Sequence, residues 1–173
     1  MLLDGEEWAA KFENFQSEAW RLETLPEYRV PQEEEEIRQF LAGERIDPHA
    51  YSNEYTDDLK RVRAEGKSKG RVHIVTRPLS DYLRYEFMYY QPHVWAGEDI
   101  RIMDVTDREN PLAGVQDFWM FDKSEVVLMH YAADGTQTSR EVHEGDASPF
   151  IAYQRIALAE SVPFEEYVKG LDV

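Results

Sequence analysis

The chain has 173 residues, of which 35 are acidic and 19 are basic, so its formal charge is −16 at pH 7. This surplus repels nucleic-acid phosphate over most of the surface, and it therefore disfavours direct nucleic-acid binding. The chain contains no cysteine, which excludes disulfides, thiolate nucleophiles and sulfur-ligated zinc.

A single domain is expected across residues 1–173. The 42% of hydrophobic residues can supply one core, and the sequence shows no internal repeat or low-complexity linker. No apolar run is long enough to span a bilayer, and the start MLLDGEEWAAKFE has neither the basic start nor the apolar core of a signal peptide. We therefore expect a cytoplasmic protein without membrane association.

The first elements are predicted from helical spacing and from proline positions. A helix is expected near Glu6 to Phe15, where three aromatic residues recur at helical spacing. The segment AWRLETLPEYRVP is expected to be a short extended piece, because Pro26 and Pro31 bracket it. The acidic run Glu33 to Glu36 suits the first turn of a second helix, because carboxylates there complement the helix dipole.

The middle of the chain predicts a strand-helix-strand unit. A helix over Glu54 to Glu65 precedes a strand over Arg71 to Val75, which is rich in β-branched residues. Ser80 can cap a helix that runs through about Tyr90, and a second strand follows over Asp99 to Val105. A connection of this length favours two parallel strands, which need not be adjacent.

Three more strands and a helical C-terminus are expected after this unit. The strands are Asp117 to Phe121, Glu125 to Tyr131 and Thr138 to His143, and the Asp134-Gly135 pair predicts a hairpin between the last two. Apolar residues alternate to both faces of FWMF, which indicates a central strand covered on both sides. The predicted fold class is α+β: one domain with a mixed five-stranded sheet packed with helices, in which the C-terminal β-hairpin is followed by helices.

Two sequence patterns resemble functional motifs without completing them. Gly66-Lys67-Ser68 lacks the earlier glycine of a phosphate-binding loop and follows a helix instead of a strand. His143-Glu144 lacks the second histidine of a zinc-protease signature, and the hairpin register separates His130 from His143 by about 13 Å. We expect no metal ion and no cofactor.

The basic stretch from Lys60 to Arg71 holds six of the 19 basic residues. Three of them are expected at a helix C-terminus on dipole grounds, and the others can solvate the following turn. The alternative is an anion-facing patch that recognises an acidic peptide or a phosphate group on a partner.

A carboxylate cluster is the most enzyme-like feature. If the strands that contain Asp99 and Asp122 pair antiparallel, these two residues lie opposite each other, with Glu98 nearby. Such a cluster could hold Mg²⁺ or share a proton. The alternative is that acidic residues merely end strands in an acidic protein.

A polar cleft is predicted near the C-terminal end of the Arg71 to Val75 strand. Loops that follow parallel strands commonly form such clefts, and the candidate side chains are Arg77, Tyr82 and Arg84.

The stretches RLETLPEY, RPLSDYLRYEF, AGEDIRI and DFWMFD resemble an uncharacterised actinobacterial family, the domain of unknown function numbered six-eight-seven-nine. The resemblance runs from the FENF region to VPFEEY. It implies a stand-alone cytosolic protein, often encoded near helix-turn-helix regulators of the XRE type and small partner proteins. It implies no catalytic residues.

The function expected from these observations is a non-enzymatic regulatory or interaction module. It would work with a helix-turn-helix regulator as its protein partner, or it would sense a small ligand. The acidic surface suits docking on a basic DNA-binding partner. The alternative is a metal-dependent hydrolase or nuclease that uses the carboxylate cluster. The oligomeric state stays open.

Overall fold

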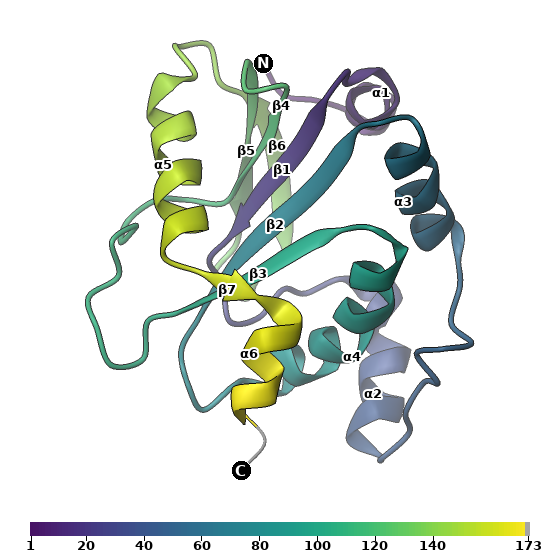
Figure 1. The fold of residues 1–173 in the computed structure, drawn as a ribbon. Helices are drawn as coiled ribbons and strands as arrows, with labels where there is room; N and C mark the ends of the chain where they lie inside the picture. The colour runs from purple at the N-terminus through teal and green to yellow at the C-terminus, as the bar shows by residue number, and fades with distance from the viewer. Residues whose placement is uncertain (172–173) are drawn as a thin grey trace.

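The computed structural model describes residues 1–171 and shows an α+β fold built on one mixed sheet (Figure 1). The sheet has seven strands in the order β6-β5-β4-β1-β2-β3-β7 within these residues. Its strands are β1 (Glu18–Glu23), β2 (Ser68–Val75), β3 (Asp99–Asp104), β4 (Phe118–Phe121), β5 (Glu125–Tyr131), β6 (Gln137–Val142) and β7 (Val162–Pro163). The helices are α1 (Gly5–Asn14), η1 (Pro31–Glu33), α2 (Glu34–Leu41), α3 (Glu54–Ala64), α4 (Asp81–Ala96), α5 (Ser148–Ala159) and α6 (Phe164–Leu171).

The expectation of five strands is wrong, because β1 and β7 also belong to the sheet. The segment of β1, EAWRLE, was expected only as an extended piece, yet it pairs parallel with β2 and antiparallel with β4 at the centre of the sheet. Its charged residues are typical of a solvent-exposed segment, so the sequence did not indicate this central position. The strand β7 has only two residues, one of them a proline, which is too short to give a sequence pattern.

The predicted strand-helix-strand unit is confirmed. The strands β2 and β3 are parallel and adjacent, and α4 connects them. Ser80 caps α4, because its hydroxyl oxygen accepts a hydrogen bond from the backbone N–H of Leu83 at 3.1 Å. The helix continues past Tyr90 to Ala96, where Gly97 ends it at a φ of 123°.

The predicted C-terminal hairpin is also confirmed. The strands β5 and β6 pair antiparallel with His130 opposite Ser139, as predicted, but an irregularity between His130 and Tyr131 shifts the register by one residue next to the turn, where Tyr131 pairs with Gln137. This register keeps His130 and His143 apart, and the backbone N–H of His143 donates to Val126.

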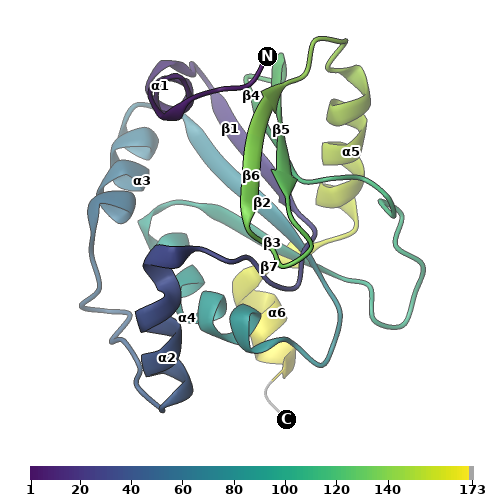
Figure 2. The same ribbon diagram turned by 180° about the vertical axis from the view of Figure 1, so that it is seen from behind.

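Helices cover both faces of the sheet, as the apolar alternation in FWMF predicts (Figures 1 and 2). Phe118 and Met120 pack in the cluster beneath α5. Trp119 and Phe121 point to the opposite face, where Phe12 of α1 meets the Trp119 ring edge-on at 4.8 Å. All four side chains of β4 are buried. No helix within residues 1–171 is long and apolar enough to cross a membrane.

Candidate functional site

The two central strands place a row of charged and polar side chains on the face opposite α5. Alternate residues of a strand point to the same face, so Arg21 and Glu23 of β1 lie beside Lys69, Arg71 and His73 of β2. In the parallel register of β1 and β2, Arg21 lies beside Arg71 and Glu23 lies beside His73. A sheet face that is covered by helices normally carries apolar side chains, so this charged row is a candidate site.

An ion pair forms the deepest part of this row. The guanidinium of Arg71 donates two hydrogen bonds to the carboxylate of Glu98, at 2.5 and 3.0 Å, and a third at 3.0 Å to Glu23. The hydroxyl of Tyr55 also donates to Glu98, at 2.7 Å. Burial favours the protonated acid, but the charge of Arg71 outweighs it and holds the pKa of Glu98 at about 2.

His73 is fully buried beside this ion pair, and its two ring nitrogens are both engaged. Nε2 lies 2.9 Å from the carbonyl of Leu25, which can only accept, so Nε2 carries a proton. Nδ1 lies 2.9 Å from the hydroxyl of Tyr90, and in the neutral ring it accepts a hydrogen bond from that hydroxyl. The imidazole therefore joins the sheet to α4 and to the turn after β1.

A cavity of about 680 Å³ opens above the charged row. Its walls come from α1, from residues 28–36, from residues 51–58, from α4 and from the β5–β6 hairpin. This volume lies within the range of small-molecule pockets in proteins. The cavity is therefore large enough for a metabolite.

One end of the cavity holds two cations, Arg21 and Lys69. The guanidinium of Arg21 lies over the ring of Trp119 at 4.8 Å, and its Nε is buried without a partner. The ammonium of Lys69 lies 4.6 Å from the ring centre of Tyr55 and 4.0 Å from a carboxylate oxygen of Asp58. Burial lowers the pKa of Lys69 to about 8. We call Arg21 and Lys69 the basic end.

The other end of the cavity pairs two carboxylates through one tyrosine. The hydroxyl of Tyr82 lies 3.0 Å from an oxygen of Glu33 and 2.6 Å from an oxygen of Glu86. It has one proton to donate, so both contacts are hydrogen bonds only if one carboxyl group is itself protonated. Burial, and next the charge of Glu86, raise the pKa of Glu33 to about 7. We call Glu33 and Glu86 the acidic end.

Tyrosine rings form a continuous wall beside the acidic end. Tyr82 and Tyr85 have ring centres 5.9 Å apart, and Tyr85 and Tyr89 follow at 5.3 Å. Tyr28 extends this wall toward the hairpin, because its ring lies 6.0 Å from Tyr82 and 5.1 Å from Tyr131. Aromatic faces attract cations, so this wall suits a positively charged group.

The two aspartates that flank FWMF hold the ends of the neighbouring strand β1. The carboxylate of Asp122 accepts backbone hydrogen bonds from Gln16, Ser17 and Glu18 at 2.9, 2.7 and 3.0 Å. Asp117 accepts from the backbone N–H of Thr24 at 2.9 Å and from the hydroxyl of Tyr28. These contacts position the chain as it enters and leaves β1.

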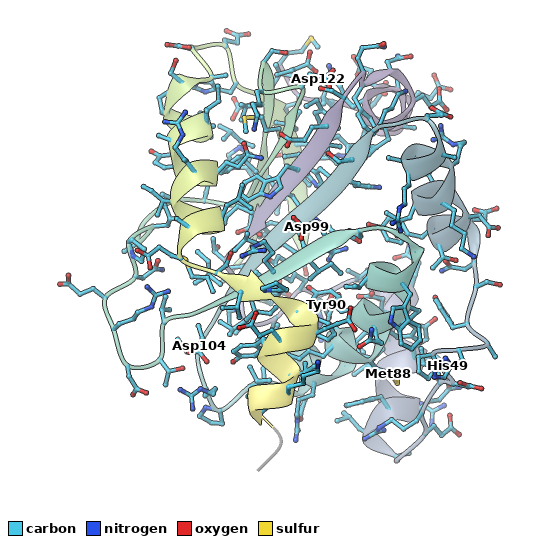
Figure 3. All side chains as sticks on the ribbon, in the orientation of Figure 1. His49, Met88, Tyr90, Asp99, Asp104 and Asp122 are labelled. Carbon is cyan, nitrogen blue, oxygen red and sulfur yellow. The ribbon has the colours of Figure 1, made fainter. Side chains whose placement is uncertain are left out.

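The predicted carboxylate cluster does not form. The strands β3 and β4 are separated by β1 and β2, so the pairing of Asp99 with Asp122 is wrong, and the two strands lie about 14 Å apart at ordinary strand spacing. Figure 3 shows Asp99 and Asp122 at separate places in the fold. Glu98 is buried against Arg71. Within residues 1–171, no group of three or more acidic or histidine side chains could hold a metal ion.

The structure also separates the three side chains of the predicted polar cleft. Arg77 pairs with Asp104 at 2.8 Å beyond the end of β2, and Arg84 is exposed beside Asp81. Tyr82 lines the cavity. Of the six candidate residues, Tyr82 alone lies in the cavity wall, and a binding role for the others stays a prediction.

The basic stretch from Lys60 to Arg71 divides between the surface and the interior. Arg61 pairs with Asp58 and Glu65 on α3, as expected near a helix C-terminus. Lys69 instead faces the cavity. The alternative of an anion-facing patch that recognises an acidic peptide or a phosphate group stays a prediction.

Sequence reasoning missed the charged row, although a signal for it was present. In EAWRLE and SKGRVHIV, charged or polar residues occupy every second position between buried apolar ones. That pattern is typical of a strand with one solvent-exposed face, so it did not predict that helices would cover the polar face.

A comparison with protein families matches residues 6–169 to a domain of unknown function, DUF6879. No curated protein matches the chain. The match spans most of the sequence and includes both central strands, both ends of the cavity and all of β4. The chain therefore belongs to the DUF6879 family.

Proposed function

We propose that this protein is a non-enzymatic module that binds a small molecule in the cavity above the charged row. The observation that carries the proposal is the pair of cations, Arg21 and Lys69, that line the cavity. Each has a carboxylate no nearer than 3.9–4.0 Å, and the buried Nε of Arg21 has no hydrogen-bond partner among the described residues. Burying a charge without hydrogen bonds destabilises a fold. A ligand that pairs with both cations would offset this cost, which is a physical reason for the fold to keep them.

The other polar groups of the row support binding over catalysis. A general base needs a free nitrogen or oxygen within reach of a substrate proton. His73 is fully buried with both ring nitrogens engaged, and Glu98 is held by Arg71 and Tyr55. These groups act as a scaffold that holds the sheet face rigid beneath the cavity.

The regulatory role is part of the same proposal. Ligand binding would take place in the cytoplasm and would change the affinity for a helix-turn-helix partner. The net charge of −16 supports docking on a basic protein surface, because opposite charges steer association. The family resemblance supports this choice of partner.

A library screen tests the binding function. Metabolites are added to the folded protein, and the melting temperature is measured, because a ligand that binds only the folded state raises it. We expect a compound that stabilises the wild type and the Arg155→Met variant, but not the Arg21→Met variant. Arg155 is exposed on α5, on the opposite face of the sheet, so it provides a matched control.

Two results would contradict the binding function. One is a broad metabolite library without a stabilising compound. The other is a set of compounds that stabilise Arg21→Met as strongly as the wild type, since those compounds would bind elsewhere.

A further inference from the structure

The cavity has two ends of opposite charge, and the strand geometry sets their separation. Lys69 at the basic end and His73 are four residues apart on β2, which corresponds to about 13 Å. Glu86 lies in the first half of α4, which begins just after β2 ends. The ring of Tyr28 lies 6.0 Å from both His73 and Tyr82, so the acidic end is near His73. A ligand that reaches from Lys69 to the acidic end must therefore be elongated.

The basic end has the chemistry of a carboxylate site. Lys69 is only 6% exposed, it lines the cavity, and its nearest carboxylate oxygen, on Asp58, is 4.0 Å away. Arg21 adds a planar fork of donors whose orientation is set by stacking on Trp119. A carboxylate matches such a fork in a bidentate geometry.

The charge of the ligand's anionic group is limited by nearby acids. Asp58 lies 4.0 Å from Lys69, and Glu23 lies 3.9 Å from Arg21. These two carboxylates already offset much of the positive charge, so a second negative charge on the ligand would be repelled. A singly charged carboxylate fits this end better than a doubly charged phosphate.

The acidic end has the chemistry of an ammonium site. Tyr82 has one proton to share between two carboxylates, and burial raises the pKa of both Glu33 and Glu86, so this end lacks a cation that would stabilise the two ionised forms. An ammonium group would donate hydrogen bonds to both carboxylates and allow both to ionise. The rings of Tyr82 and Tyr85 would add cation–π attraction.

We propose that the ligand is a small elongated zwitterion, with a carboxylate bound by Arg21 and Lys69 and an amino group bound by Glu33 and Glu86. This inference rests on the proposed binding function. It names the class of ligand: amino acids or other amino-carboxylates whose two charged groups are separated by an apolar or aromatic spacer.

A matched series of probes tests the class. The ω-amino-alkanoates are titrated into isotopically labelled protein at constant ionic strength, with the alkyl chain lengthened one methylene at a time. Each is compared with the alkanoate and the alkylamine of the same length, and binding is followed by NMR chemical shifts. We expect an optimum chain length at which the zwitterion binds at least about tenfold more tightly than either singly charged analogue.

Variants assign the two ends. Arg21→Met and Lys69→Met should each weaken the zwitterion and the alkanoate, while Arg155→Met should leave both unchanged. The double variant Glu33→Gln and Glu86→Gln should lose the preference for the zwitterion but still bind the alkanoate. Because it removes two carboxyl groups whose pKa is raised by burial, this variant should fold at least as well as the wild type.

Three results would overturn the inference. They are equal binding of the zwitterion and the alkanoate at every length, equal binding of the zwitterion and the alkylamine, and no binding of any probe at millimolar concentration. If the metabolite screen still yields ligands that depend on Arg21, only the zwitterion class fails. If that screen fails as well, the binding function itself is wrong.

Discussion

Removing one partner of the Arg71–Glu98 ion pair should cost more stability than removing both. In Glu98→Gln, the guanidinium of Arg71 stays charged and almost fully buried, and Glu23 alone remains to pair with it. Breaking a buried ion pair costs about 3–5 kcal/mol, and the loss should lie toward the lower end of this range because Glu23 stays paired with Arg71. In Arg71→Met, the buried carboxylate of Glu98 loses both guanidinium hydrogen bonds, so a similar cost is expected.

The double variant Arg71→Met and Glu98→Gln leaves neither charge of the pair. It should be more stable than either single variant, and the coupling between the two sites should exceed about 2 kcal/mol. The free energy of unfolding is measured by urea titration of the four proteins. Additive losses, equal within about 0.5 kcal/mol to the sum of the single changes, would show that the pair is not electrostatically isolated from water and would refute the reasoning.

The Arg71–Glu98 ion pair also predicts how the free energy of unfolding changes at acidic pH. The pKa of Glu98 falls from 4.5 to about 2 in the folded protein, where Arg71 stabilises the ionised form against the effect of burial. Its contribution is therefore complete above about pH 4.5 and is lost as the pH falls to about 2. Stability should fall less steeply over this window in Glu98→Gln than in the wild type, as measured by urea titration at each pH.

Three further predictions concern the strand β4 and the basic end. Phe118→Ala and Phe121→Ala should each cost about 3–5 kcal/mol in urea titration, because the two rings are buried on opposite faces; a loss below about 1 kcal/mol at either would show an uncovered face. Asp122→Ala should cost about 1–2 kcal/mol, because three backbone N–H groups at the start of β1 lose their acceptor, whereas the highly exposed Asp107→Ala should leave the melting temperature unchanged. Lys69→Met should raise the free energy of unfolding by about 1–2 kcal/mol at pH 7, because burial of the charged ammonium lowers the pKa of Lys69 from 10.5 to about 8. The cost of burying this charge is complete below about pH 8 and gone above pH 10.5. An unchanged or lower stability of the variant would show that the ammonium is well solvated.

Local chemistry in the sequence predicted the elements that depend on short segments. Ser80 caps its helix, the Asp134-Gly135 pair lies in the turn between β5 and β6, and FWMF is buried on both faces. Each of these features depends on residues within a few positions of one another. Their backbone preferences and apolar alternation therefore act before any tertiary contact forms.

The order of the strands could not be predicted in the same way. The sequence does not state which strands are neighbours, and the proposed pairing of Asp99 with Asp122 failed because β1 and β2 lie between β3 and β4. The central place of β1 was hidden for a related reason. Arg21 and Glu23 resemble residues of a solvent-facing strand, and only the helices above them turn that face into an interior.

The candidate site is therefore a product of the tertiary structure. Its basic end joins Arg21 with Lys69, and its acidic end joins Glu33 with Glu86, pairs that lie roughly fifty residues apart in the chain. The sequence by itself determined the residue types and the face on which each strand presents them. Only the packing of the helices over the sheet decided that these charges share one cavity, because burial and proximity arise from long-range contacts that leave no local pattern.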